Sequence, residues 1–135
     1  MVILLDTGPW VALLCKNDRH HIWAKQQFAA HTTAFLTCEA VVTETCFLLA
    51  RAGVDAGRAL ELIERGVVQI GFNLSEQAVS VRNLYSRYDN VPASLADACL
   101  IRMSERHEPC QVLTIDSDFH IYRRHGRKTI PVISP

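Results

Sequence analysis

Four acidic residues in apolar surroundings are the side chains of this 135-residue chain best suited to chemistry. They are Asp6, Glu44, Asp97 and Asp116. Asp6 and Asp116 each directly follow a short apolar run, the kind that forms a strand buried on both faces of a parallel sheet. Glu44 and Asp97 lie within two apolar segments with helical character. The positions of these acids predict a pocket of carboxylates at one edge of a sheet.

Each acid also has an ordinary structural interpretation. Asp97 can stabilise the first turn of a helix through the helix dipole, and Asp116 with Asp118 can form an Asx turn. Asp6 can cap the helix that follows it, and Glu44 can be exposed to solvent on its helix. Taken alone, Asp97 and Asp118 favour the ordinary interpretation, and the other three leave the question open.

Taken together, the acids favour a metal site. The carboxyl ends of parallel strands meet at one edge of a sheet, and a helix that follows a loop at that edge begins there too. Clustered carboxylates raise each other's pKa, so they need a counter-charge to stay ionised. Oxygen ligands without a Cys or His cluster select Mg²⁺ or Mn²⁺. Such ions activate water and stabilise the transition state of phosphoryl transfer, which predicts a phosphodiester hydrolase.

The elements that must position these acids alternate between strands and helices along the chain. This alternation predicts a parallel sheet with helices on both faces, within a single domain that covers residues 1–135. The expected strands are 2–5, 34–37, 67–72, 110–115 and 129–133. The expected helices are 10–14, 21–30, 39 or 40 to 51, 55–65, 75–88 and 94–107, with a loop at 89–93 and a helical turn at 118–122.

Composition limits the class of protein. A hydrophobic fraction of 49% supplies a real core, and 14 basic against 14 acidic residues give no overall charge that would indicate a nucleic-acid partner. The five cysteines form no C-x-x-C pair, which is typical of free thiols in a reducing cytosol. The N-terminus does not resemble a signal peptide, and the longest apolar stretch, 40–50, is too short to span a membrane. We therefore expect a cytoplasmic protein without membrane contact.

The order and spacing of the acidic motifs resemble those of PIN-domain ribonucleases, in particular the VapC-type toxins of bacterial toxin–antitoxin pairs. The motifs are LLDTG around Asp6, VVTETCFLL around Glu44, SLADACLI around Asp97 and TIDSDF around Asp116. The resemblance extends over nearly the whole chain. It implies an α/β, PIN-like three-layer fold with a central parallel sheet of four or five strands and helices on both faces.

The resemblance also implies roles for the acids in a metal-dependent endoribonuclease that leaves 5′-phosphate and 3′-hydroxyl ends. Asp6 and Asp97 match direct ligands of Mg²⁺ or Mn²⁺, and Asp116 matches a ligand that binds directly or through water. Glu44 matches a ligand or a residue that positions the attacking water, with Glu39 as a rival acid. Asp118 matches an additional acid that supports the site or binds a second ion.

Hydroxyl and basic side chains are the candidates for binding substrate. Thr7 and Thr114 match small hydroxyl positions beside the first and fourth acids of the family. Four basic residues directly follow the acidic loop, and we expect them to flank the pocket and contact RNA phosphates. They are Arg123, Arg124, Arg127 and Lys128. An ordinary solvated basic loop is at least as compatible with the sequence.

The resemblance implies an RNA substrate, an antitoxin partner and a homodimer. A nuclease of RNA maturation without an antitoxin would carry the same motifs. A catalytically silent PIN-like protein that only binds RNA is a further alternative, although the presence of all four acids counts against it. An aspartyl phosphatase is disfavoured because Thr7 and Gly8 follow Asp6, where that class needs a second Asp two residues on.

Overall fold

The central sheet of the computed structural model, which describes residues 1–88, 91 and 93–135, has five parallel strands. From one edge to the other they are β3 (Val68–Ile70), β2 (Phe35–Thr37), β1 (Val2–Leu5), β4 (Cys110–Leu113) and β7 (Val132–Ile133). A separate antiparallel pair consists of β5 (Arg123–Arg124) and β6 (Lys128–Thr129). The predicted α/β class with a parallel sheet of four or five strands is confirmed, with five strands.

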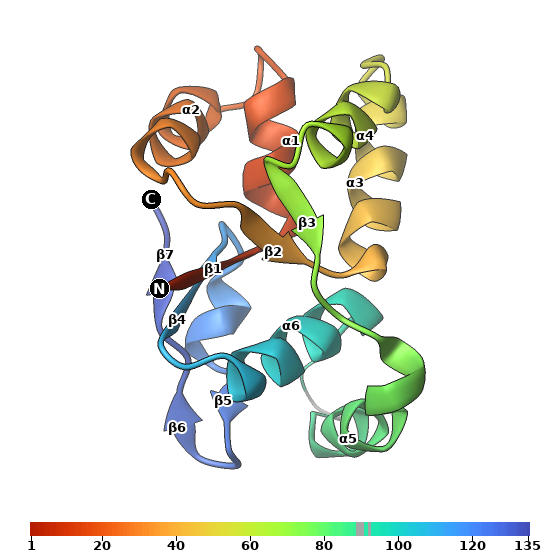
Figure 1. The fold of residues 1–135 in the computed structure, drawn as a ribbon, viewed down its shortest axis with the longest axis vertical. Helices are drawn as coiled ribbons and strands as arrows, with labels where there is room; N and C mark the ends of the chain where they lie inside the picture. The colour runs from red at the N-terminus through yellow and green to blue at the C-terminus, as the bar shows by residue number, and fades with distance from the viewer. Residues whose placement is uncertain (89–90, 92) are drawn as a thin grey trace.

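Helices cover both faces of this sheet (Figure 1). On one side lie α1 (Thr7–Leu14), α2 (His21–Ala30) and α4 (Gly57–Glu64), and on the other lie α5 (Leu74–Arg87) and α6 (Leu95–Arg106). Helix α3 (Glu39–Arg51) packs against both α1 and α6, and a short 3₁₀ helix, η1 (Ser117–His120), follows β4. Among the described residues, none of the helices has the length and apolar character that crossing a membrane requires.

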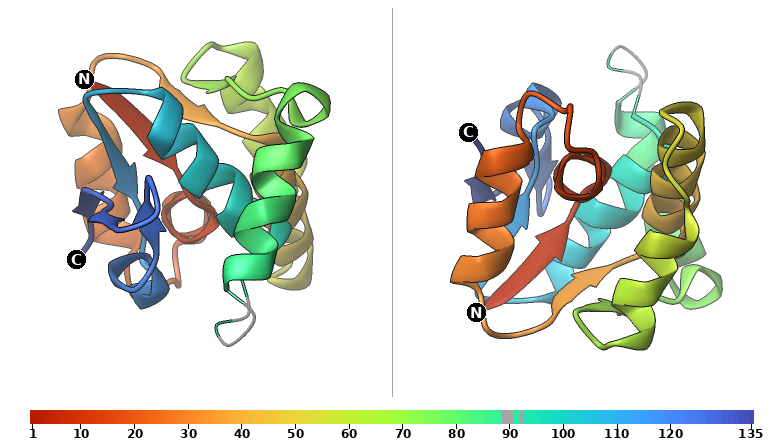
Figure 2. Two further views of the ribbon diagram at one scale, coloured as in Figure 1. Left: turned by 90° about the horizontal axis from the view of Figure 1, so that it is seen from below. Right: turned by 90° about the horizontal axis from the view of Figure 1, so that it is seen from above.

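Strand β1 is the centre of the core. Its residues Leu4 and Leu5 are fully buried, and Leu4 lies opposite Leu36 of β2 and Val112 of β4. Both views of Figure 2 show α1 end on at the tip of β1, so the chain turns sharply out of the sheet at that point. The fold therefore holds the end of β1 between two neighbouring strands and the beginning of a helix.

The structure differs from the predicted elements mainly at their ends. Helix α1 begins at Thr7 rather than at residue 10, because Asp6 accepts a hydrogen bond from the Thr7 backbone N–H and so caps the helix. The predicted strand 129–133 is divided between β6 and β7. Pro131 lies between these two pieces and has no N–H to donate to a strand ladder. The predicted loop 89–93 falls largely on residues 89, 90 and 92, which lie outside the described residues.

The burial of β1 gives a test of its central position. Replacing Leu4 with Ala removes a fully buried side chain and leaves a cavity, so we expect the free energy of unfolding to fall by about 2–5 kcal/mol. Leu60→Ala on α4 is the matched control, because Leu60 is 48% exposed and its truncation should change stability by less than about 1 kcal/mol. Urea denaturation followed by circular dichroism measures both. Equal losses in the two variants would contradict the burial pattern.

Candidate active site

Asp6 lies directly after β1, and the residue is 5% exposed. One carboxylate oxygen, Oδ1, accepts a hydrogen bond of 2.8 Å from the Thr7 backbone N–H. The other, Oδ2, accepts a hydrogen bond of 2.7 Å from the hydroxyl of Thr114, which follows β4. These residues meet because Leu5 and Leu113, the last residues of their strands, lie opposite each other in the sheet. The ends of β1 and β4 therefore bring a carboxylate and a hydroxyl together, as the parallel arrangement predicts.

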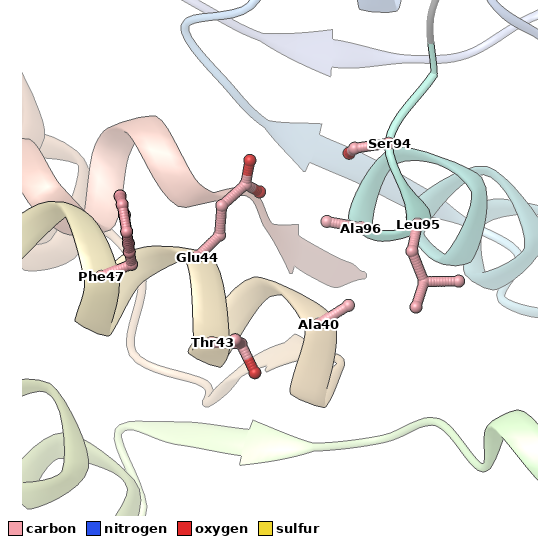
Figure 3. Close-up of a pocket in the computed structure, with 7 residues that line it drawn as sticks. All are labelled: Ala40, Thr43, Glu44, Phe47, Ser94, Leu95 and Ala96. Atoms are coloured by element: carbon pink, nitrogen blue, oxygen red, sulfur yellow. The ribbon is translucent and has the colours of Figure 1, made fainter.

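Glu44 reaches the same place from α3. Its Oε2 accepts a hydrogen bond of 3.1 Å from the Thr7 hydroxyl, so Thr7 contacts Asp6 through its backbone and Glu44 through its side chain. Glu44 is exposed to solvent, and Figure 3 shows it projecting from α3 into the space beside Ser94, where α6 begins. The rival acid Glu39 lies in the first turn of α3 and does not line the cleft that contains Asp6.

Asp97 is held by the start of α6 and by a tyrosine. Ser94 and Asp97 form a capping box in which the Ser94 hydroxyl accepts from the Asp97 backbone N–H and Asp97 Oδ2 accepts from the Ser94 backbone N–H. The hydroxyl of Tyr122 donates a further hydrogen bond of 3.1 Å to the same Oδ2. Burial raises the pKa of Tyr122, so this hydroxyl stays protonated and remains a donor. The sequence predicted a helix that begins at residue 94 with Asp97 in its first turn, whereas it did not predict the contact with Tyr122.

Asp116 and Asp118 form the Asx turn that the sequence suggested, and both also face the site. Asp116 Oδ1 accepts a hydrogen bond of 2.9 Å from the Asp118 backbone N–H at the start of η1. The Asp116 backbone N–H donates to the hydroxyl of Thr114, which in turn donates to Asp6. Asp116 and Asp118 therefore form a structural turn and also line the candidate site.

One cleft of about 350 Å³ brings all five predicted acids together. Its lining residues are Asp6, Thr7, Gly8, Glu44, Leu48, Ser94, Asp97, Asp116 and Asp118. In this conformation no three His, Cys, Asp or Glu side chains in the described part of the chain are close enough to hold one metal ion. The carboxylates thus share a cleft but are not drawn together into a coordination sphere.

Two acids of the cleft, Asp6 and Asp97, have raised pKa values. The pKa of Asp6 is raised from its usual 3.8 to about 7, mainly by burial and also by the charges of Asp97 and Asp116, while the hydrogen bonds from Thr114 and Thr7 oppose the rise. Burial also raises the pKa of Asp97, with contributions from the charges of Asp116 and Glu44. Among residues 1–88, 91 and 93–135, the salt bridges are Arg102–Glu105 and Arg124–Glu108, so no basic side chain is paired with an acid of the cleft.

An apolar pocket of about 400 Å³ adjoins the acidic cleft (Figure 3). Its lining residues come from α3 and from the start of α6, and they are Ala40, Thr43, Glu44, Phe47, Ser94, Leu95 and Ala96. Glu44 and Ser94 line both spaces, so the two adjoin at these residues. Phe47 is 57% exposed, and the guanidinium of Arg51 lies 5.7 Å from the centre of its ring.

The four basic residues that we expected to flank the pocket lie on the β5–β6 hairpin, in which β5 runs along α6 away from the end that carries Asp97. The backbone N–H of His125, at the end of β5, donates to Glu105, which is about 12 Å from Asp97 along the helix axis. None of the basic residues lines the cleft. These residues are Arg123, Arg124, Arg127 and Lys128.

Two of these basic side chains are used inside the protein. The Arg124 guanidinium is buried, donates to the Ser104 carbonyl oxygen and forms a salt bridge of 2.9 Å with Glu108. The Arg123 guanidinium donates to three carbonyl oxygens at the end of η1, those of residues 120, 121 and 122. Arg127 and Lys128 are exposed in the β5–β6 hairpin. Arg124 is therefore a structural anchor, and the expectation that it contacts substrate does not fit its position.

The raised pKa of Asp6 has a consequence for stability when divalent cations are removed with EDTA. Between about pH 4 and about pH 7 the folded protein keeps a proton on Asp6 that the unfolded chain releases, so the free energy of unfolding falls as the pH rises through this range. One pKa unit corresponds to about 1.4 kcal/mol, which limits the effect to about 4 kcal/mol. Asp6→Asn should lose this slope, as measured by urea denaturation at several pH values, while the smaller slope from Asp97 remains.

Thr114→Val provides a graded version of this experiment. It removes the hydroxyl that lowers the pKa of Asp6, so the decline in stability should extend to higher pH than in the wild type. Thr37→Val is the matched control, because Thr37 is also buried at the end of a strand but donates to the Leu5 carbonyl oxygen. It should lower stability without moving the pH range. An unchanged pH slope in Asp6→Asn would refute the assignment to this carboxylate.

Comparisons with known proteins agree with this fold. The family model described as PIN domain matches residues 3–124. A solved structure of VapC20 from Mycobacterium tuberculosis, described as a toxin that cleaves the sarcin–ricin loop, superposes with a TM-score of 0.78. The two sequences are 24% identical, and the match covers 86% of this chain and 91% of that one, a level of similarity that shows a shared fold. No curated protein sequence matches the chain. Because the family model covers most of its length, the chain belongs to the PIN-domain family.

Proposed function

We propose that this protein is a metal-dependent endoribonuclease of the VapC type, the toxin of a toxin–antitoxin pair. The observation that carries the proposal is a single cleft lined by five carboxylates, with the buried Asp6 paired to no basic side chain in the described part of the chain. Membership of the PIN-domain family and the shared fold with a toxin described as cleaving the sarcin–ricin loop support it.

The donor set of the cleft fits a hard divalent cation such as Mg²⁺ or Mn²⁺. All the candidate ligands are carboxylate oxygens, and each oxygen of Asp6 accepts a single hydrogen bond, which leaves it able to bind a cation as well. Asp6, Asp97 and Asp116 would hold the ion, with Asp118 beside them. These side chains must approach one another more closely than they do in this conformation. The ion would supply charge neutralisation and a more acidic bound water.

The protein's own groups would orient the reacting partners. Thr114 and the Thr7 N–H orient both oxygens of Asp6, and Tyr122 with Ser94 orients Asp97, so both carboxylates would need only a small adjustment to bind an ion. Glu44 is exposed and is restrained by the Thr7 hydroxyl. It can therefore accept a proton from a water molecule in the cleft and direct that water at a phosphodiester.

RNA that extends beyond the cleft would contact the exposed Arg127 and Lys128 of the β5–β6 hairpin, which would bind phosphates at a distance from the cut. An antitoxin, a homodimer and a cytoplasmic location complete the proposal. A nuclease of RNA maturation would use the same site without an antitoxin. Growth arrest on expression of the chain, relieved by the product of the neighbouring gene, distinguishes the toxin from that alternative.

Substitution of the proposed ligands should abolish cleavage. We expect Asp6→Asn and Asp97→Asn to lower the rate of RNA cleavage in the presence of Mn²⁺ by about 100-fold or more, and EDTA to do the same to the wild type. A gel assay with a fluorescent RNA that contains a sarcin–ricin stem-loop measures the rate. Asp55→Asn, an exposed change on another loop, is the control. Full activity in Asp6→Asn would rule out the proposed site.

Glu44 and Glu39, both on α3, form a matched pair that tests the role of Glu44. Glu44→Gln should lower the cleavage rate by about 100-fold, because the neutral amide cannot take a proton from water. Glu39→Gln changes an exposed acid five residues away that does not line the cleft, so it should retain activity. Both variants should unfold at the same temperature as the wild type, which separates chemistry from stability. The opposite ranking of the two variants would transfer the role to Glu39.

A further inference from the structure

Helix α3 carries an acid, an exposed aromatic ring and a cation along one of its faces. Glu44, Phe47 and Arg51 follow one another at spacings of three and four residues, which place them on the same face of a helix. From Glu44, the rise of the helix puts Phe47 about 4.5 Å and Arg51 about 10.5 Å further along the axis. All three are exposed to solvent, and Figure 3 shows Glu44 and Phe47 projecting to the same side of α3. This face therefore leads from an acid of the cleft to a ring and then to a positive charge.

The ring of Phe47 and the charge of Arg51 are both accessible to a ligand. More than half of Phe47 is exposed, and the Arg51 guanidinium lies beside its ring. Arg51 forms no salt bridge in the described part of the chain, so no acid there neutralises its charge. An exposed aromatic ring offers a stacking surface to a nucleobase, and a guanidinium binds phosphate through charge-assisted hydrogen bonds. The pair therefore suits both parts of a nucleotide.

Phe47 also forms part of the wall of the apolar pocket, which adjoins the acidic cleft at Glu44 and Ser94. The pocket, of about 400 Å³, has room for one planar base. A nucleotide extends from its phosphate through the sugar to the base, so a phosphate at the cleft can place a base in the neighbouring pocket. The cleft and the pocket therefore match the two ends of one nucleotide.

The polar side chains that line the pocket already have hydrogen-bond partners inside the protein. The hydroxyl of Thr43 donates to a backbone carbonyl oxygen of α3, and the hydroxyl of Ser94 accepts from the Asp97 backbone N–H. Glu44 accepts from the Thr7 hydroxyl. The rest of the lining is apolar and consists of Ala40, Phe47, Leu95 and Ala96. A base in this pocket is therefore held by stacking and packing more than by hydrogen bonds to its edges.

We propose that the apolar pocket binds one unstacked base of the RNA, next to the phosphodiester in the cleft, with Phe47 as the stacking surface and Arg51 as the contact for a neighbouring phosphate. This inference rests on the proposed function, because it places RNA across the cleft. The charge of Arg51 favours a nucleotide over an apolar peptide segment, because only the nucleotide brings a negative charge to it. Since stacking strength grows with the area of the base, a purine binds more tightly than a pyrimidine.

The test is a binding assay that does not depend on cleavage. The full-length chain carries Asp6→Asn so that the RNA stays intact, and fluorescence anisotropy in Mg²⁺ follows three labelled single strands of equal length. These are hexaadenylate, hexauridylate and a chain of six abasic ribose phosphates. We expect hexaadenylate to bind most tightly and Phe47→Leu to weaken it by about 10-fold, while the affinity for the abasic chain stays unchanged. Phe47→Trp should restore binding, and its added tryptophan emission should be quenched by hexaadenylate but not by the abasic chain.

Two further variants separate the base from the phosphate and from general effects. Arg51→Gln should weaken all three chains by a similar factor, because each of them carries phosphates. Ile22→Ala is the matched control, because Ile22 is 68% exposed on α2 and lines neither the pocket nor the cleft. It should leave all three affinities unchanged. Phe47 is exposed, so its variants should unfold at the same temperature as the parent protein.

The outcomes distinguish this inference from the proposed nuclease. Equal loss of the abasic chain and hexaadenylate in Phe47→Leu, or no loss of either, would overturn the base pocket, and the second result would assign the pocket to a protein partner instead. Failure of every chain to bind would overturn the base pocket together with the proposed function. If the three chains bind as expected while the wild-type protein cuts no RNA, the base pocket stands and only the nuclease proposal fails.

Discussion

The burial of one carboxylate at the end of the central strand is the constraint on which the site depends. Asp6 is almost inaccessible to solvent, and its hydrogen bonds come from the Thr7 backbone and the Thr114 hydroxyl. Placing it at the tip of β1, between β2 and β4, leaves it little freedom to move. The cost of that burial shows in its pKa, which is raised to about 7. Every other acid of the cleft is arranged around a group that the fold has already made difficult to ionise.

Two threonines connect Asp6 to the other elements. Thr114 is 108 residues from Asp6 in the sequence. Its hydroxyl accepts a hydrogen bond from the Asp116 backbone N–H and donates one to Asp6, so the end of β4 positions both acids. Thr7 joins Asp6 at the start of α1 to Glu44 on α3. Asp97 is positioned separately, by its own capping box and by Tyr122. Short side chains at the ends of strands and helices therefore fix the positions of the acids in the cleft relative to the sheet.

The sequence predicted those parts of the fold and site that depend on local patterns. Apolar runs that end in an acid located β1 and β4, and the parallel arrangement that follows from alternating strands and helices placed Asp6 and Asp116 at one edge of the sheet. Tyr122 could not be found in this way, because it reaches Asp97 only through the turn of η1 and no periodic pattern marks it. The direction of the basic hairpin depends on how β5 packs along α6, which a count of charges does not reveal.

Stability alone does not explain why residue 6 is an aspartate. The cap that it provides for α1 contributes about 1 kcal/mol, and serine or asparagine would supply a similar cap without a charge. Ionising the buried carboxylate costs more than that, since a pKa raised from 3.8 to about 7 corresponds to about 4 kcal/mol. The neighbouring charges of Asp97 and Asp116 increase this cost rather than relieve it. The divalent cation of the proposed function would reverse the balance, because it would stabilise the ionised form of all three carboxylates at once.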